Sequence, residues 1–157
     1  MKRSPAPSKK EALLRLMKLC SRSEKSTYEI KMKLKNWGLE THAKEIIDQL
    51  QKENFLDDSR YARAFVHDKI LLNKWGRIKI RYQLIAMGIP DSLVENELAS
   101  FESSKYEQMV FEELARKKNL LKNLQAMQLK IKLYAFGKQR GYETEIIRKF
   151  IDDRVKL

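Results

Sequence analysis

The sequence predicts an all-α protein made of three tandem three-helix repeats that form an elongated, curved helical array. Glycine and proline are scarce, with 5 and 3 among 157 residues, so few positions interrupt a helix. Apolar residues recur at helical intervals along most of the chain. A segment ended by glycine also occurs three times, at Gly38, Gly88 and Gly141, with spacings of 50 and 53 residues. A recurring unit of this length is typical of stacked helical repeats.

The repeat is clearest in the segments that precede these glycines. Residues 29–39 and 79–89 have isoleucine, leucine and glycine at equivalent positions. The third copy is weaker because Gly137 stands where the first two have leucine. Gly88 is predicted to have a positive φ that disfavours a side chain, whereas Gly137 is expected to tolerate alanine better. We expect a disordered basic tail over residues 1–7 and repeats over residues 8–55, 56–103 and 104–157.

Local signals predict three helices in the first repeat. Ser8 and Ser26 are each followed three residues later by glutamate, which is the pattern of a capping box. Gly38 is the predicted left-handed end of the second helix, and Thr41 is a candidate N-cap for the third. Apolar residues at helical spacing are expected to form the core: Leu13, Leu16, Met17, Cys20, Ile30, Leu34, Trp37, Ala43, Ile46, Ile47 and Leu50.

Similar signals predict six more helices. The Asp57–Asp58 pair is expected to cap the first of them, Gly76 to end it, and Gly88 to end the next. Ser104 begins a further capping-box pattern. The expected core residues are Tyr61, Ala62, Phe65, Val66, Ile80, Leu84, Met87, Leu93, Val94, Leu98, Tyr106, Val110, Leu114, Leu129, Leu133, Phe136, Ile147, Phe150 and Ile151.

The charge of the chain indicates an anionic partner. Thirty-three basic and 21 acidic residues give a formal charge of +12, and the sequence pI is about 9.8. Nucleic acid, an anionic membrane and an acidic protein are the candidate classes. A single lysine usually lies on a solvated helix face, but the total exceeds what solubility requires. The predicted binding residues are Arg60, Arg63, Lys74, Arg77, Lys79, Arg81, Arg116, Lys117, Lys118, Lys138 and Arg140.

The sequence contains no recognisable catalytic motif. We expect that the protein is not an enzyme and that it binds neither a metal ion nor a cofactor. His42 and His67 are far apart, Cys20 is the single cysteine, and Gly137–Lys138 lacks the rest of a phosphate-binding loop. Capping is the favoured role of the Asp57–Asp58 pair over paired catalytic carboxylates. One cysteine and no apolar run near the roughly 20 residues of a membrane span predict a cytoplasmic protein, expected to be a monomer.

Two DNA-binding interpretations compete with simpler ones. Trp37 and Trp75 could stack on bases, but burial is the favoured interpretation because Trp37 continues an apolar stripe. Short helices joined by glycine turns are also typical of helix-turn-helix proteins. Here the turns recur in series, however, and no helix carries the polar face that reads base edges.

The motifs of the central repeat resemble those of the RecX family. Residues 56–62 (Leu-Asp-Asp-Ser-Arg-Tyr-Ala), 76–80 (Gly-Arg-Ile-Lys-Ile) and 84–89 (Leu-Ile-Ala-Met-Gly-Ile) are similar to that family's central block. The outer repeats match less closely, through Ser23, Ser26, Leu34 and Gly38 at one end and Arg140-Gly141-Tyr142 at the other. The resemblance covers residues 11–153, approximately.

The resemblance implies a three-repeat helical protein that lies in the groove of a RecA–DNA filament. It further implies a regulator, most often negative, that restrains filament growth, ATP hydrolysis and strand exchange by RecA in DNA repair, recombination and the SOS response. The implied partners are the RecA filament and, weakly and without sequence preference, single- and double-stranded DNA. Two alternatives are an autonomous DNA-binding protein or transcription factor, and a scaffold for an acidic protein.

Overall fold

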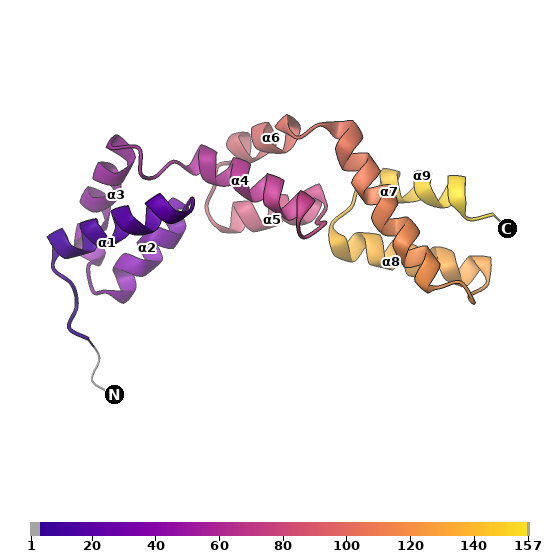
Figure 1. Cartoon of the computed structure of the whole chain (residues 1–157), viewed down its shortest axis with the longest axis horizontal. Coiled ribbons are helices and arrows are strands. Elements are labelled where there is room, and N and C mark those ends of the chain that lie inside the picture. Colours follow the sequence, from indigo (N-terminus) through magenta and orange to yellow (C-terminus); the bar gives the residue numbers. More distant parts are fainter. Residues whose placement is uncertain (1–3, 157) are drawn as a thin grey trace.

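The structure is a computed structural model that describes residues 4–156. Over this range the chain forms nine α-helices, one short 3-10 helix and no strand. They are α1 (Lys9–Arg22), α2 (Thr27–Asn36), η1 (Glu40–His42), α3 (Ala43–Lys52), α4 (Asp58–Leu71), α5 (Arg77–Ala86), α6 (Asp91–Ser100), α7 (Ser103–Leu120), α8 (Ala126–Arg140) and α9 (Thr144–Arg154). In Figure 1 these helices form successive groups along one curved axis, with α1–α3 at one end and α7–α9 at the other. The predicted all-α repeat fold is confirmed.

The segment before α1 is only partly described. Residues 1–3 of the predicted tail lie outside the described range, whereas residues 4–7 have no regular secondary structure. Pro7 is buried, and residues 4–7 line a recess together with Trp37 of the first repeat.

Several predicted helix ends are confirmed. Ser8 Oγ accepts a hydrogen bond from the backbone N–H of Glu11 at 3.2 Å, and Ser26 with Glu29 forms the full reciprocal capping box at the start of α2. The three repeat glycines, Gly38, Gly88 and Gly141, have φ values of 74°, 77° and 87°. These ends depend on residues close together in sequence, which is why the pattern predicts them.

Two predicted caps are wrong. Thr41 lies inside η1, and α3 begins after His42 without a side-chain cap. Ser104 does not cap α7, because the helix begins at Ser103 and so already includes Ser104. The Ser104 hydroxyl donates to Glu102 at 2.7 Å. Glu107, the expected partner of Ser104, instead accepts from Lys149 Nζ at 2.6 Å.

Gly76 does not end α4, contrary to our prediction. That helix ends at Leu71, and Lys74 takes the left-handed conformation in the following turn, with φ of 58°. Gly76 is instead the N-cap of α5, with φ of −84°. Glycine is needed at this position because the backbone of Gly141 lies very close to it. A Cβ at position 76 would lie 2.1 Å from the carbonyl oxygen of Gly141.

The buried residues form two separate cores. The first repeat has its own cluster: Ala12, Leu16, Ile30, Leu34, Ile46, Ile47, Leu50 and Leu56. The second and third repeats share the other cluster, which contains side chains from each helix from α4 to α9. Phe101 and Tyr142, which lie between helices, also belong to it. Cys20 is only half-buried, and burial raises the pKa of its thiol. The array is therefore one single repeat joined to a two-repeat body.

Backbone hydrogen bonds join the second repeat to the third. The first N–H groups of a helix have no partner within that helix, and α5 has no capping side chain. Gly76 N donates to Arg140 O at 2.7 Å, and Ile78 N donates to Gly141 O at 3.1 Å. Arg77 N, between them, donates to the hydroxyl of Tyr106 at 3.0 Å. The end of α8 and the start of α7 thus cap α5.

Side chains join the first repeat to the second. Asp57 caps α4. Asp58 instead accepts a hydrogen bond from the backbone N–H of Thr27, in the first repeat, at 2.8 Å. Arg60 Nε lies 3.1 Å from a carboxylate oxygen of Glu24. This joint consists of polar contacts between separate cores.

We predict that Gly76→Ala destabilises the protein more than Gly88→Ala. At Gly88 nothing lies within 4 Å of an added methyl group, so the cost is that of a positive φ, about 1 kcal/mol. At Gly76 the methyl group forces the third repeat away from α5 and breaks its hydrogen bonds. Urea unfolding followed by circular dichroism gives both free energies. A loss at Gly76 equal to or smaller than that at Gly88 would contradict the backbone joint.

At Gly137 the structure shows a packing contact that the sequence did not indicate. Gly137 lies in the helical part of α8, and a Cβ would lie 2.6 Å from Ile147 Cδ1. The small residue therefore makes room for α9, and alanine there requires the Ile147 side chain to shift.

Candidate nucleic-acid interface

The eleven predicted basic residues divide into two chemical groups. All six arginines lie within 4.0 Å of a carboxylate oxygen. None of the five lysines has such a carboxylate partner among residues 4–156. Arginine's planar, rigid guanidinium suits fixed ion pairs, whereas lysine is a flexible point charge. The arginines thus form internal links, and the lysines provide most of the uncompensated charge.

Arg60 and Arg63 of α4 pair with carboxylates of different segments. Besides pairing with Glu24, Arg60 donates to the carbonyl of Asn54 at 2.9 Å. Arg63 Nε lies 3.1 Å from Glu97, a residue of α6 that is only 6% exposed. A nearly buried carboxylate requires a partner, so Arg63 contributes to the packing of α4 on α6.

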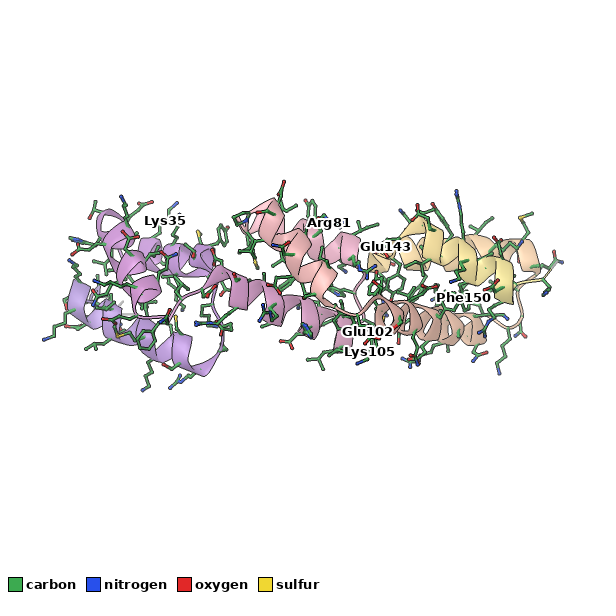
Figure 2. All side chains as sticks on the ribbon, turned by 90° about the horizontal axis from the view of Figure 1, so that it is seen from above. Lys35, Arg81, Glu102, Lys105, Glu143 and Phe150 are labelled. Atoms are coloured by element: carbon green, nitrogen blue, oxygen red, sulfur yellow. The ribbon has the colours of Figure 1, made fainter. Side chains whose placement is uncertain are left out.

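Arg77 is part of a buried network at the joint of the second and third repeats. Its guanidinium carbon lies 3.9 Å from the centroid of the Tyr106 ring, and 3.7 Å separates Nη1 from Glu143. The Tyr106 hydroxyl donates to Glu143 Oε1 at 2.8 Å. Figure 2 places Glu143 at the boundary between the two helix groups. Burial raises the pKa of the Glu143 carboxyl and of the Tyr106 hydroxyl.

Arg81, one turn further along α5, makes a more exposed pair. Its Nε lies 2.5 Å from Glu95 Oε1 on α6. This hydrogen bond lowers the pKa of the Glu95 carboxyl. Exposed pairs contribute little to stability, so Arg81 remains the more available of the two α5 arginines.

Helices α7 and α8 bring three predicted residues together around one recess of about 210 Å³. Arg116, Lys117 and Arg140 line it together with Leu120 and Phe136. Lys117 Nζ and Arg140 Cζ lie 5.5 and 4.9 Å from the ring centroid. These residues are up to 24 positions apart in sequence, so their meeting could be foreseen only from the packing of α7 against α8.

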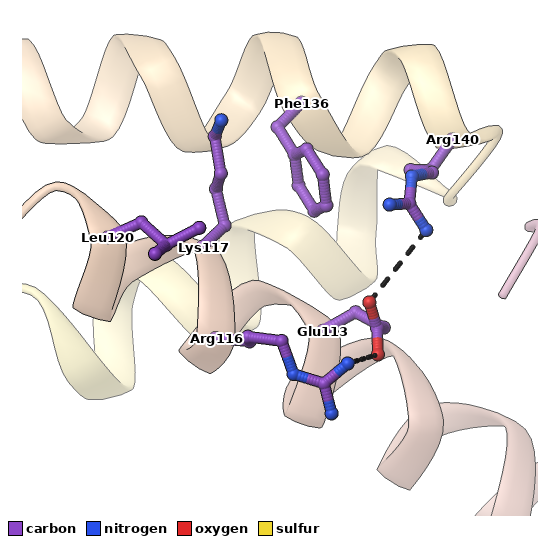
Figure 3. A pocket seen from close by; sticks show the side chains of 6 residues that line it. All are labelled: Glu113, Arg116, Lys117, Leu120, Phe136 and Arg140. Carbon is purple, nitrogen blue, oxygen red and sulfur yellow. Dashed lines mark hydrogen bonds and ion pairs between the residues drawn. The ribbon is translucent and has the colours of Figure 1, made fainter.

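Glu113 is the residue of this recess that the sequence did not indicate. It is 5% exposed and pairs with Arg116 at 2.9 Å and Arg140 at 3.8 Å, as the dashed lines in Figure 3 mark. One carboxylate thus faces two guanidinium groups, and the recess keeps a net positive charge. An anion entering it would compete with Glu113 for the remaining N–H donors of both arginines.

The remaining predicted lysines are not among the residues that line this recess. Lys79 Nζ lies 4.4 Å from the ring centroid of Trp75. Lys118 donates to the carbonyl of Arg154 at 2.6 Å, and Lys138 donates to the hydroxyl of Thr144 at 3.2 Å. The carbonyl of Lys74 accepts from the Tyr142 hydroxyl at 2.6 Å.

The two tryptophans pack against the cores. Trp37 belongs to the periphery of the first-repeat core and Trp75 to that of the shared core. Trp75 also has the ammonium group of Lys69 4.7 Å from its ring centroid. Partial burial of both rings agrees with the packing interpretation.

Metal-ligand clusters and membrane-spanning helices are both absent from the described part of the chain. No group of three or more histidine, cysteine or acidic side chains within residues 4–156 is arranged to hold a metal ion. No helix in that range is long and apolar enough to cross a membrane.

Known proteins share both the sequence motifs and the helical arrangement of this chain. Residues 57–98 match the family described as RecX, second three-helix domain. A regulatory protein RecX of Clostridium beijerinckii is 33% identical over 144 residues, which cover 90% of this chain and 66% of that protein. A regulatory protein RecX of Clostridium botulinum is 31% identical over 150 residues, which cover 94% of this chain and 69% of that protein. The chain belongs to the RecX family.

The RecX fold extends over the whole array. The crystal structure of RecX from Lactobacillus salivarius superposes with a TM-score of 0.82, covering 92% of this chain and 94% of that one. The sequences are only 19% identical, so this likeness concerns the fold. This chain spans about two thirds of the length of the clostridial RecX proteins.

We predict that Arg77→Ala lowers the free energy of unfolding by about 2 kcal/mol, because it leaves the half-buried Glu143 carboxylate without its charged partner. Arg81→Ala, which removes an exposed pair, is the matched control and should cost less than about 1 kcal/mol. Urea unfolding measures both. Equal losses in the two variants would show that the network around Glu143 contributes no more to stability than an exposed ion pair.

We also predict that Glu113→Gln strengthens the binding of anionic polymers. The substitution keeps the shape of the side chain but frees Arg116 and Arg140 from their shared carboxylate. Glu112→Gln, an exposed neighbour on α7, makes the same change in net charge. Affinity for heparin or DNA is measured for both at low salt. A gain no larger than that of Glu112→Gln would mean that the recess does not bind anions.

Proposed function

We propose that this member of the RecX family is a negative regulator of the RecA recombinase. It binds along the RecA–single-stranded DNA filament and limits filament growth, ATP hydrolysis and strand exchange. It acts without catalysis of its own, as a monomer in the cytoplasm. The observation that carries the proposal is family membership combined with an array of three helix groups that extends along one axis (Figure 1).

The shape of the chain supports binding to a polymer. A curved array contacts a partner over its whole length, and several weak contacts made together give a high overall affinity. A small-molecule substrate is favoured less, because binding sites for such molecules are usually enclosed. The recess at Phe136 is open to solvent and lies between residues of α7 and α8.

The chemistry of the surface supports contact with nucleic acid in that filament. The net charge of +12 attracts phosphates. The lysines of the predicted surface keep their charge free of carboxylate partners over residues 4–156, and such point charges bind phosphates without reading sequence.

The second candidate function is that of an autonomous DNA-binding protein. The observation that favours it is the same excess of positive charge, which binds bare DNA with or without RecA. A footprint at a defined DNA sequence in the absence of RecA would select this candidate.

The test is a titration of RecA filaments with this protein. We predict that the DNA-dependent ATPase of the cognate RecA falls at less than one copy per RecA protomer, because one array covers several protomers. Filament length measured by electron microscopy should fall over the same range. An unchanged ATPase and unchanged filaments, with binding to bare DNA intact, would refute the regulator proposal.

A truncated chain provides the control for multivalent binding. The third repeat shares its core with the second, so its removal would expose apolar surface. The first repeat has a separate core that ends at Leu56, so a chain beginning at Asp57 keeps the shared core intact. This chain should inhibit RecA only at higher concentration than the full chain. Equal potency would show that the first repeat makes no contact.

A further inference from the structure

The net charge of the protein is concentrated on the second helix of each repeat. Helices α2, α5 and α8 contain a single acid, Glu29, and the basic residues Lys31, Lys33, Lys35, Arg77, Lys79, Arg81, Lys130, Lys132, Lys138 and Arg140. These three helices therefore carry +9 of the net +12. Most of the excess charge lies on less than a quarter of the chain.

Lysine provides the free part of this charge. The three arginines pair with Glu143, Glu95 and Glu113. None of the seven lysines on these helices makes an ion pair with a described carboxylate, since the paired lysines are Lys9, Lys105 and Lys149. The uncompensated ammonium groups are therefore spread over all three repeats.

The exposed tyrosines lie on the same helices. Of the six tyrosines, Tyr61, Tyr106 and Tyr142 are buried. The other three are Tyr28 on α2, Tyr82 on α5 and Tyr134 on α8, and their exposed fractions are 46%, 72% and 37%. Each repeat therefore presents one accessible aromatic ring from its second helix.

Aliphatic side chains surround these rings. Eight of the twelve exposed large hydrophobic residues in the described part of the chain are on α2, α5 and α8. Besides the tyrosines they are Met32, Ile78, Ile85, Met127 and Ile131. Single exposed apolar residues are ordinary on a protein surface, but their concentration on one helix of every repeat indicates a common use.

Helical geometry directs these side chains away from the core. In α5 the buried positions are Ile80 and Leu84. At 3.6 residues per turn, Ile78, Tyr82 and Ile85 fall on the opposite face. The equivalent positions of α2, offset by 50, are Tyr28, Met32 and Lys35, and that of Ile78 in α8 is the exposed Ile131. In Figure 1, α2, α5 and α8 lie below α3, α6 and α9, along one edge of the array.

We propose that the outward sides of α2, α5 and α8, here called the second-helix face, bind single-stranded nucleic acid. Tyr28, Tyr82 and Tyr134 stack on bases, while the lysines of the same helices contact phosphates. This assignment deepens the proposed function, on which it rests for the class of partner, by naming the face that meets the strand in the filament.

Lysine content favours nucleic acid over a protein partner. Protein interfaces are depleted of lysine, whereas this face has seven lysines and one acid. A protein partner would have to bring a matching acidic surface to all three repeats. A nucleic-acid strand has a phosphate at every residue and meets this requirement along its whole length.

The tyrosines favour a single strand over a duplex. Aromatic side chains stack on bases that are free of their neighbours, and each stack contributes about 1–3 kcal/mol. In a duplex the bases are already paired and stacked, so the rings gain little there. Lysine contacts, by contrast, serve both forms equally.

The test measures binding of the full chain, without RecA, to a labelled oligo(dT) and to a duplex of equal length by fluorescence anisotropy. The triple variant Tyr28→Leu, Tyr82→Leu, Tyr134→Leu keeps apolar bulk but removes the rings. It should bind oligo(dT) at least about tenfold more weakly, with duplex affinity almost unchanged. Tryptophan at the same three positions should restore binding to oligo(dT), because it stacks at least as well.

A lysine series provides the second arm. Lys33→Ala, Lys79→Ala and Lys132→Ala together should weaken binding to both DNA forms and flatten its dependence on salt. The matched control replaces three exposed lysines of other segments, Lys18, Lys52 and Lys122, with alanine. This control should have a smaller effect.

Three outcomes would overturn the proposal. The first is absence of oligo(dT) binding by the unmodified protein. The second is equal loss of single- and double-strand binding in the leucine variant, because the rings would then have no stacking role. The third is unchanged oligo(dT) binding combined with weakened binding to the RecA filament, which would identify a protein-docking face. The DNA-binding assay contains no RecA. A negative result in the RecA titration alone would therefore refute the regulator proposal without changing what the DNA-binding assay says about this face.

Discussion

The start of helix α5 is the point on which the rest of the array depends. Its first N–H groups need acceptors outside the helix, and the third repeat provides them through the carbonyls of Arg140 and Gly141 and the hydroxyl of Tyr106. This contact requires backbone to meet backbone, which is possible only with glycine at position 76. The direction of the third repeat is thereby fixed relative to the second, and one apolar core continues through both.

The sequence was informative where structure depends on near neighbours. The capping box at Ser26 and the positive φ of Gly38, Gly88 and Gly141 follow from residues a few positions apart. Gly76 was misassigned because the reason for its glycine lies in another repeat. Tyr142, for example, bonds to the carbonyl of Lys74 from 68 positions away. Such pairings become visible only when the repeats are stacked.

The predicted site shows the same division between near and distant effects. Charge counting identified the basic character of the chain, but it could not separate the arginines that pair with acids from the lysines that have no carboxylate partner among residues 4–156. Arg63 and Glu97 are 34 positions apart, so their pairing has no local sequence signal. Formal charge at a position and charge available to a partner are therefore different quantities, and here the residue type distinguishes them.

The separate core of the first repeat has a consequence for how the molecule loses its structure. A chain with one core unfolds in a single cooperative transition, whereas stacked units with weaker junctions open one unit at a time. The polar contacts at Asp58 and Arg60 can break without exposing the apolar cluster on either side. The amino-terminal repeat can then fray or swing while the other two stay folded. Backbone amides of α1–α3 would exchange with solvent independently of those in α4–α9.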